Sequence, residues 1–155
     1  MLELKRLNAG YGRAHILFDL DLQLRAGEVV ALLGRNGAGK TTTLKAAIGL
    51  LRSFSGDVFF DKKRINDLEP FQIARLGLGY VPEDRRIFTD LTVMENLDVG
   101  RQPPRGGAPR WTPEKLFELF PNLGRMRERR GGSMSGGEQQ MLTIARSLMG
   151  NPSAL

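Results

Sequence analysis

The sequence predicts an α/β fold in which a small antiparallel sheet precedes a parallel core. Three observations lead to this prediction. Two alternating stretches open the chain, a continuous apolar run then enters a Gly-rich turn followed by a helix-like segment, and short strand-like and helix-like segments alternate after it. From about residue 85 the pattern changes to helices and loops, which predicts an inserted helical subdomain.

The N-terminal part is expected to contain mostly strands. Residues Leu2–Leu7 and Ile16–Leu24 predict two antiparallel strands. Residues 28–34, EVVALLG, form an apolar run rich in β-branched residues, which is typical of a parallel strand covered on both faces. A helix is then expected over 40–50 and another strand over 55–61.

The second half is expected to be mostly helical. Thr112 is a predicted N-cap, Pro70 and Pro113 lie in first turns, and Gly150 is a predicted C-cap. The Pro- and Gly-rich loop from Gln102 to Arg110 is expected to be mobile and to lack a packed element. We predict helices over 70–77, 92–100, 112–120 and 136–149, and a buried strand over 78–82.

Length and composition indicate a globular protein. The chain has 155 residues, and its longest unbroken apolar run, Val29 to Leu33, is far shorter than the roughly 18 residues of a membrane span. There is no cysteine and no signal-peptide pattern at the start. We therefore expect a cytoplasmic protein without disulfides or a thiolate zinc site.

The net charge of +6 is unevenly distributed. Residues 101–130 carry 8 Lys or Arg against 3 acidic residues, and the rest of the chain is nearly balanced. A solvated Arg-rich surface is one interpretation. The other is a face that meets an acidic partner or anionic lipid headgroups.

The first chemical motif is GRNGAGKT, Gly34 to Thr41, which fits G-x-x-x-x-G-K-[ST] between a predicted strand and helix. Glycines let backbone N–H groups surround a polyphosphate, and the positive end of the following helix adds to the attraction. Lys40 supplies a charge for the β and γ phosphates, and Thr41 supplies a hydroxyl for Mg²⁺. The predicted ATP-binding residues in this phosphate-binding loop are Gly34, Arg35, Asn36, Gly37, Ala38, Gly39, Lys40, Thr41 and Thr42.

The second motif is MSGGEQQ, Met134 to Gln140, another Gly-rich turn that opens a helix. Taken alone, Ser135 and two glycines could form only an N-cap and a flexible turn. The Ser135 hydroxyl, the amides of Gly136 and Gly137 and the helix N-terminus could also bind an anion. Because the chain has one phosphate-binding loop, this second turn predicts a site completed by another chain in a head-to-tail dimer.

The order Tyr11, GRNGAGKT, YVPED and MSGGEQQ resembles the ATP-binding subunits of ABC transporters over essentially the whole chain. The resemblance implies the ABC type of phosphate-binding-loop NTPase fold, with ATP and Mg²⁺ as cofactors and Tyr11 stacked on adenine. The stretches VPEDRRIFTDLTVMENL and SGGEQQML are more specifically similar to branched-chain amino-acid import ATPases.

The chain departs from the family pattern at several positions. Glu83 stands where a glutamine usually reaches Mg²⁺, and since a carboxylate is also a good ligand, the resemblance implies a magnesium site at Thr41 and Glu83. Met134 and Glu138 replace the commoner leucine and glutamine of the signature turn. The resemblance implies that this turn contacts ATP of the partner chain through Ser135, Gly136, Gly137 and Glu138.

The family's catalytic carboxylates are missing from this sequence. The resemblance implies a strand ending in Asp and Glu after the signature helix, but no aspartate follows Asp98 and the last glutamate is Glu138. The only histidine, His15, precedes the phosphate-binding loop and is expected to be an ordinary surface residue. We interpret NPSAL, residues 151–155, as the start of that strand, so the catalytic residues are unknown and expected beyond Leu155.

The expected organisation is a nucleotide-binding core over 1–84, a helical subdomain over 85–150 and the beginning of the catalytic strand over 151–155. A chain that ends there is incomplete at its C-terminus. We therefore expect the 155-residue form to lack ATP hydrolysis and to be unstable or to associate.

The leading functional hypothesis is the ATPase subunit of an importer of branched-chain amino acids. The resemblance implies membrane permease subunits and a second ATP-binding subunit as partners, an indirect link to a solute-binding protein, and a position on the inner face of the membrane. An importer of urea, amides or another small solute is the first alternative. A soluble ABC-type ATPase acting on nucleic acid or ribosomes is a weaker one, because the chain shows neither two ATPase units nor a coiled-coil insertion, and nucleic acid is not an expected partner.

Overall fold

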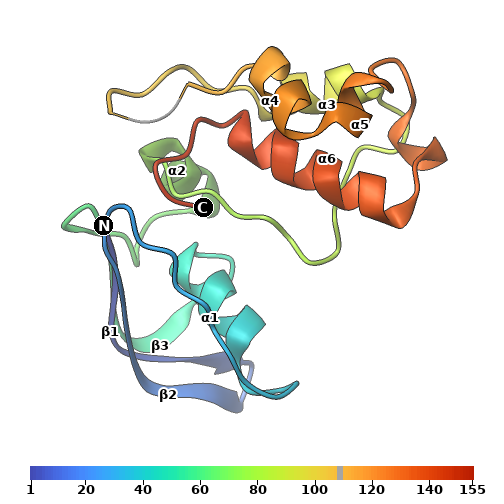
Figure 1. Ribbon diagram of the computed structural model, residues 1–155. Coiled ribbons are helices and arrows are strands. Elements are labelled where there is room, and N and C mark those ends of the chain that lie inside the picture. The colour runs from blue at the N-terminus through green and yellow to red at the C-terminus, as the bar shows by residue number, and fades with distance from the viewer. Residues whose placement is uncertain (108–109) are drawn as a thin grey trace. The chain divides into compact units, whose positions relative to one another are not determined.

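The structure is a computed structural model that describes residues 1–107 and 110–155. The chain forms two compact units, Met1–Leu76, named unit 1, and Gly77–Leu155, named unit 2 (Figure 1). The predicted mobile loop includes residues 108 and 109, which lie outside the described residues. Within the described ranges, no helix combines the length and apolar character that crossing a membrane requires.

Unit 1 is built on an antiparallel sheet. Its strands are β1 (Leu2–Tyr11), β2 (Ala14–Leu24), β3 (Ser53–Phe60) and the short β4 (Lys63–Arg64). The strand order is β2-β1-β3-β4, and each neighbouring pair is antiparallel. The predictions of two opening antiparallel strands and a strand near 55–61 are confirmed.

Bulges in this sheet keep the apolar side chains of β1 on one face. Leu4 and Leu7 are both buried although they are three residues apart, which simple alternation would not allow. Between them Arg6 has a φ of 42° and the pairing register shifts. Opposite this bulge, a Cβ on Gly56 would lie 2.2 Å from the Arg6 carbonyl oxygen, so only glycine fits there.

Two helices complete unit 1, α1 (Lys40–Ala47) after the Gly-rich loop and α2 (Pro70–Leu76), which begins at a proline as predicted. They contribute buried small and branched side chains to the core of this unit. The fully or nearly fully buried apolar residues of unit 1 are Leu2, Leu4, Leu7, Ala9, Leu17, Ala46, Ala47, Val58, Phe60, Ile65 and Ile73.

The segment 28–34 does not form the predicted buried parallel strand. It has no assigned secondary structure, and Val29 and Leu33 are 98% and 90% exposed. An apolar run becomes a parallel strand only when flanking strands pair with it and other elements cover its faces. None of the described strands pairs with this segment, so the prediction of a buried strand is wrong here.

Unit 2 is helical, as predicted. It contains α3 (Val93–Gly100), α4 (Pro113–Leu119), α5 (Pro121–Gly124), a 3-10 turn η1 (Gly131–Ser133) and α6 (Gly136–Leu148). Thr112 caps α4 and Pro113 begins it, which confirms that prediction. The apolar core of this unit consists of Val93, Leu97, Leu116, Phe117, Leu123, Met134, Leu142, Ala145 and Met149.

The predicted strand over 78–82 is reduced to a single parallel bridge between Leu78 and Ala154. The Gly79 N–H donates to the Ala154 carbonyl at 2.8 Å, and the Ser153 N–H donates to the Gly77 carbonyl at 2.8 Å. The expectation of a five-residue strand is therefore wrong in extent, because a strand needs a longer paired neighbour than the bridge provides.

Part of the basic stretch over 101–130 is used inside unit 2. Arg105 donates to the carbonyls of Gly150 and Asn151 at 2.5 and 2.8 Å, and Arg101 pairs with Asp98 at 2.6 Å. The described part of the Pro- and Gly-rich loop contains no helix or strand, as predicted, but Arg105 attaches it to the end of the chain.

Candidate functional site

The phosphate-binding loop of unit 1 is shaped by glycines at its turns. Gly37 and Gly39 have φ values of 84° and 93°, in the left-handed region that favours glycine. A Cβ on Gly39 would also lie 2.8 Å from the Leu17 side chain of β2. The loop therefore needs glycine at position 39 both for its conformation and for its close approach to the sheet.

The N-terminus of α1 is open to an anion. Gly39 is its N-cap, no side chain caps its amides, and no acidic residue lies in its first turn. The Lys40 ammonium lies over the loop and donates to the carbonyls of Gly34 and Arg35 at 2.7 and 2.9 Å. Uncapped amides, a helix N-terminus and an ammonium group form a donor set that fits a polyphosphate.

The other predicted residues of this loop lie close by in unit 1. Residues 34–38 are exposed, and Thr41 in the first turn of α1 is half-buried. Thr42 is only 6% exposed. The neighbouring Thr43 anchors the helix, because its hydroxyl and its N–H both donate to the Gly39 carbonyl, at 2.9 and 2.8 Å.

Tyr11 lies at the end of β1, where it pairs with Ala14, and its side chain is 48% exposed. Two residues earlier, Ala9 pairs with Leu17, the residue that touches Gly39. Unit 1 therefore brings an exposed aromatic side chain to the part of the sheet that supports the phosphate-binding loop.

His15 is exposed, as expected, but it is not isolated. Its ring stacks on Phe18 with a centroid distance of 4.0 Å and meets Phe54 edge-on at 5.4 Å. Its Nε2 atom lies 3.1 Å from Asn8 Oδ1. The contact with Asn8 ties β2 to its neighbour β1, and the contact with Phe54 reaches β3 beyond it.

In unit 2, the signature turn forms a capping box at the start of α6. The Ser135 N–H donates to the Glu138 carboxylate at 2.7 Å, and the Glu138 N–H donates to Ser135 Oγ at 3.4 Å. The backbone bond from Ser135 lowers the pKa of Glu138 below its usual value. This arrangement was not predicted from the sequence, although the S-x-x-E spacing is its ordinary signal.

The capping box leaves donors available at this turn. Ser135 Oγ acts as an acceptor in the cap, so its own proton remains for a ligand. Ser135, Gly136 and Gly137 are all exposed, and a Cβ on Gly137 would meet nothing within 4 Å. The Glu138 carboxylate adds a negative charge at the same N-terminus, which is unfavourable for a second anion.

The two predicted magnesium ligands lie in different units. Thr41 belongs to the first turn of α1 in unit 1, and Glu83 lies in an exposed turn of unit 2. A hydroxyl and a carboxylate are suitable oxygen ligands for Mg²⁺, so the residue types fit. Among the described residues, no group of three or more His, Cys, Asp or Glu could hold a metal ion by itself.

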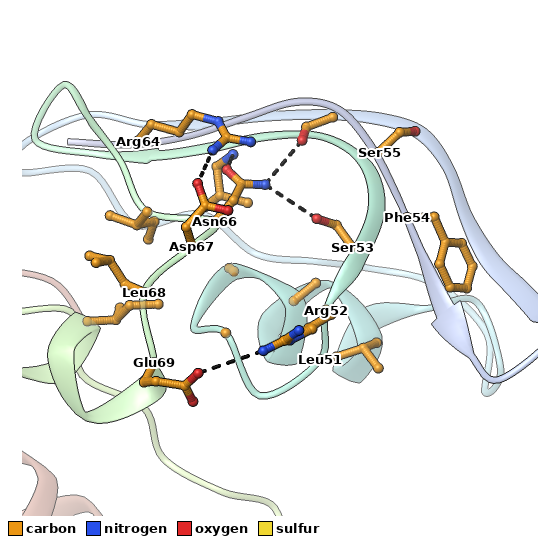
Figure 2. Close-up of a pocket in the computed structure, with 17 residues that line it drawn as sticks. Leu51, Arg52, Ser53, Phe54, Ser55, Arg64, Asn66, Asp67, Leu68 and Glu69 are labelled. Atoms are coloured by element: carbon orange, nitrogen blue, oxygen red, sulfur yellow. Dashed lines mark hydrogen bonds and ion pairs between the residues drawn. The ribbon is translucent and has the colours of Figure 1, made fainter.

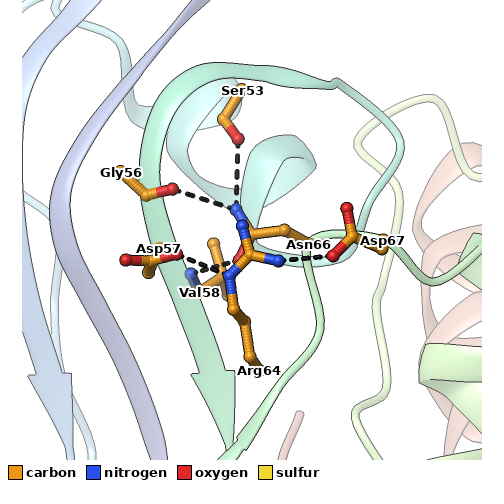
Figure 3. Close-up of polar contacts among 7 residues, drawn as sticks. All are labelled: Ser53, Gly56, Asp57, Val58, Arg64, Asn66 and Asp67. Carbon is orange, nitrogen blue, oxygen red and sulfur yellow. Dashed lines mark hydrogen bonds and ion pairs between the residues drawn. The ribbon is translucent and has the colours of Figure 1, made fainter.

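Unit 1 also has a cavity of about 340 Å³ beside β3, which none of the predicted site residues lines (Figure 2). In the cavity wall, the Asn66 side chain binds backbone groups and one neighbouring side chain. Asn66 donates to the Gly56 carbonyl at 3.1 Å and to Ser53 Oγ at 3.3 Å, and accepts from the Val58 N–H at 2.8 Å (Figure 3).

The two arginines of this cavity wall pair with carboxylates. Arg64 pairs with Asp57 at 2.6 Å and also with Asp67 (Figure 3). Arg52 lies 3.8 Å from Glu69 (Figure 2). Because these cations already have carboxylate partners, the cavity wall supports the fold rather than an anion site.

Curated proteins similar to this chain are ATP-binding subunits of transport systems. The high-affinity branched-chain amino acid transport ATP-binding protein BraG of Pseudomonas aeruginosa is 39% identical over all of this chain and 66% of its own length. The lipopolysaccharide export system ATP-binding protein LptB of Haemophilus influenzae is 36% identical over 98% of this chain and 64% of its own length. The chain thus spans slightly less than two thirds of the length of these relatives.

Solved structures show the same fold and confirm the predicted fold class. An ATP-binding subunit of an ABC transporter matches with a TM-score of 0.82 at 31% identity, over 97% of this chain and 62% of its own. A dimeric ATP-binding cassette in a post-hydrolysis state, bound to ADP and phosphate, matches with a TM-score of 0.80 at 25% identity, over 98% of this chain and 71% of its own. Residues 17–155 match the family described as ABC transporter, and the chain therefore belongs to that family.

Proposed function

We propose that this chain is the greater part of the ATP-binding subunit of an ABC importer, which couples ATP hydrolysis to the uptake of branched-chain amino acids. The observation that carries the nucleotide part is the open N-terminus of α1, with Lys40 lying over the loop carbonyls. The likeness to BraG supports the choice of solute.

In this proposal, unit 1 holds the nucleotide. Backbone N–H groups of residues 34–42 and the Lys40 ammonium bind the phosphates, and Tyr11 stacks on adenine. Thr41 and Glu83 supply oxygen ligands for Mg²⁺, which neutralises charge on the phosphates when bound. The division into a core over 1–84, a helical subdomain over 85–150 and the beginning of the catalytic strand over 151–155 belongs to the same proposal.

The partners follow from the two separate phosphate-binding turns. Ser135, Gly136 and Gly137 at the start of α6 would contact ATP held by the loop of a second ATP-binding subunit, in a head-to-tail dimer. The similar cassette that was solved as a dimer with ADP and phosphate supports this arrangement. The chain would lie on the inner face of the membrane, bound to permease subunits and linked through them to a solute-binding protein.

Two measurements test the proposal. The full-length protein, reconstituted with its permease in proteoliposomes, should hydrolyse ATP faster when the binding protein carries leucine, isoleucine or valine than when it carries urea. The 155-residue chain should not turn over ATP, because the catalytic Asp and Glu are expected beyond it. Normal turnover by the 155-residue chain would contradict the expected location of the catalytic residues. A response to urea alone would contradict the choice of branched-chain amino acids as the solute.

Lipopolysaccharide export is a second candidate, favoured by the 36% identity to LptB over nearly all of this chain. The same proteoliposomes distinguish it. An exporter subunit should be stimulated by lipopolysaccharide and its own permease, and should not respond to an amino-acid-binding protein.

A further inference from the structure

Three side chains on one face of α6 bind the backbone of the segment that carries Glu83. Thr143, Arg146 and Ser147 follow the i, i+3, i+4 spacing of neighbours on a helix surface. Each contacts a main-chain carbonyl within residues 80–86 of the same unit. We call these three residues the α6 clamp.

The two hydroxyl groups of the clamp hold the segment on both sides of Glu83. Ser147 Oγ donates to the Tyr80 carbonyl at 3.1 Å, and Thr143 Oγ1 donates to the Arg85 carbonyl at 2.7 Å. Each hydroxyl also lies near a carbonyl of its own helix, at 3.0 and 2.8 Å, so each single proton is shared between α6 and the segment. Breaking these contacts would free the segment without removing the helix.

Arg146 provides the charged part of the clamp. Its Nη2 donates to the Arg86 carbonyl at 2.6 Å, and its guanidinium lies 5.1 Å from the centre of the Phe88 ring. Burial lowers the pKa of Arg146, and its Nη1 is buried without a hydrogen-bond partner. Among the described residues no carboxylate forms an ion pair with Arg146. Burying a charged guanidinium is unfavourable, so its contact with the segment explains why Arg146 lies there.

The clamped backbone is in a conformation that needs external support. Arg85 and Arg86 have φ values of 61° and 47°, both in the left-handed region, where non-glycine residues are uncommon. Such residues persist when the surrounding structure holds them. The carbonyls of these two strained residues are the ones that Thr143 and Arg146 bind.

The same helix carries the signature turn at its start. Ser135 caps α6, and Thr143 lies eight residues later, roughly 12 Å along the axis at the usual helical rise. Arg85 Nη1 also donates to Gln139 at 3.2 Å and would lie 2.9 Å from a Cβ on Gly136. One rigid element therefore holds both the signature turn and the turn at Glu83.

We propose that Thr143 and Arg146 are positioning residues that fix the turn at Glu83 to α6, so that contact of Ser135 with a partner's ATP and placement of the Glu83 carboxylate occur as one movement. The inference rests on the proposed function for the presence of ATP and Mg²⁺. Its structural part, the support of the strained turn by α6, stands on the contacts alone.

The test uses full-length protein with a non-hydrolysable ATP analogue and Mn²⁺ in place of Mg²⁺, with Mn²⁺ affinity measured by electron paramagnetic resonance. Thr143→Val should weaken Mn²⁺ binding roughly tenfold, the lower end of the range for changing a residue that orients a metal ligand. Thr143→Ser should restore it. In a Glu83→Ala background, which removes the oxygen ligand, Thr143→Val should have no further effect, because it acts through Glu83.

Thr92→Val is the matched control, since it removes a hydroxyl that caps α3 in the same unit and does not contact segment 80–86. It should lower thermal stability and leave Mn²⁺ affinity unchanged. An equal effect of Thr143→Val with and without Glu83→Ala, or no effect at all, overturns the proposal.

Hydrogen exchange without nucleotide tests the support of the turn by α6 separately from its effect on metal binding. Thr143→Val should speed exchange at the amides of residues 83–86, while Thr92→Val should not. Unchanged exchange refutes the clamp whatever the nucleotide results are. Failure of the wild-type protein to bind the analogue refutes instead the proposed function, and with it the link between Ser135 and Glu83.

Discussion

Helices α1 and α6 both begin at Gly-rich turns proposed to meet phosphate, but their N-terminal amides have different partners. At α1 the N-cap is Gly39, and neither a capping side chain nor an acidic residue of the first turn is present. At α6 the N-cap is Ser135, and Glu138 closes a capping box with it. The positive end of α1 is thus open, and that of α6 is partly neutralised by its own carboxylate.

This difference predicts that the α1 turn binds an anion by itself and that the α6 turn binds one only together with another subunit. The α1 turn has an ammonium and uncapped amides in one unit, so it can hold a polyphosphate alone. The α6 turn offers a hydroxyl proton and exposed glycines beside a negative charge. We expect it to bind only a phosphate that another subunit already holds, so ATP binding should precede dimer formation.

The largest expected effect concerns the cation of the α1 turn. Lys40→Ala should weaken ATP binding by at least about 100-fold, because hydrogen bonds to charged groups contribute about 1.5–3 kcal/mol each. Lys45→Ala, in the last turn of the same helix, is the control and should bind normally. Calorimetric titration of the full-length proteins measures the ATP affinity of both variants. Equal affinities for Lys40→Ala and wild type would show that the start of α1 is not the ATP site.

A second pair of variants compares the glycines of the two turns. Gly39→Ala should destabilise the protein by roughly 1–2 kcal/mol, because position 39 is left-handed and a Cβ there approaches Leu17. Gly137→Ala lies in the first turn of α6 with open space around it, and should stabilise the helix by up to about 1 kcal/mol. Urea unfolding gives both values, and a stable Gly39→Ala protein would show that the loop has another conformation.

Glu138→Gln sharpens the electrostatic part of the comparison. Glutamine keeps the capping box but removes the negative charge, so ATP-dependent dimers should form at roughly fivefold lower ATP concentration, a gain of about 1 kcal/mol. Glu95→Gln makes the same change in the capping box of α3 and should leave dimerisation unchanged. Light scattering as a function of ATP concentration measures dimer formation for both variants. If both variants form dimers at the same ATP concentration, the charge at the start of α6 has no special role.

The smallest effect is the response to acid. Backbone hydrogen bonds at the capping boxes lower the pKa of Glu138 and Glu95 below 4.5 in the folded protein. Their stabilisation is therefore complete above about pH 4.5 and is lost as the pH falls through the folded-state values. Trp111, the only tryptophan of this sequence, lies in unit 2 and reports its unfolding.

Urea midpoints from Trp111 fluorescence should thus decrease below pH 4.5, and Glu138→Gln should flatten the decrease. In unit 1, helix α1 has no acidic residue in its first turn, so this source of acid sensitivity is absent from that helix. A midpoint that rises on acidification would contradict the sign of this linkage.

Local signals predicted most of the elements. Alternation gave β1 and β2, the Gly-rich motif gave the start of α1, and Thr112 with Pro113 gave the start of α4. These features depend on residues close in sequence, through side-chain periodicity, capping and the fixed φ of proline.

The errors lie where distant residues decide the outcome. The apolar run over 28–34 has a strand composition, yet strand formation requires neighbours that local composition does not specify. The contacts of Thr143 and Arg146 with carbonyls about 60 residues earlier have no sequence signal either. The capping box of Ser135 and Glu138 was different, since its spacing is local and could have been found.

The bridge between Leu78 and Ala154 also bears on the kinetics of folding. It joins residues 76 positions apart, whereas the contacts within α3 and α6 are local. Closing a long loop costs entropy before its few contacts are gained, so the bridge should form after the helices have packed. Mutations at the bridge should then speed unfolding of unit 2 and leave its folding rate nearly unchanged, which makes this contact a determinant of lifetime rather than of folding speed.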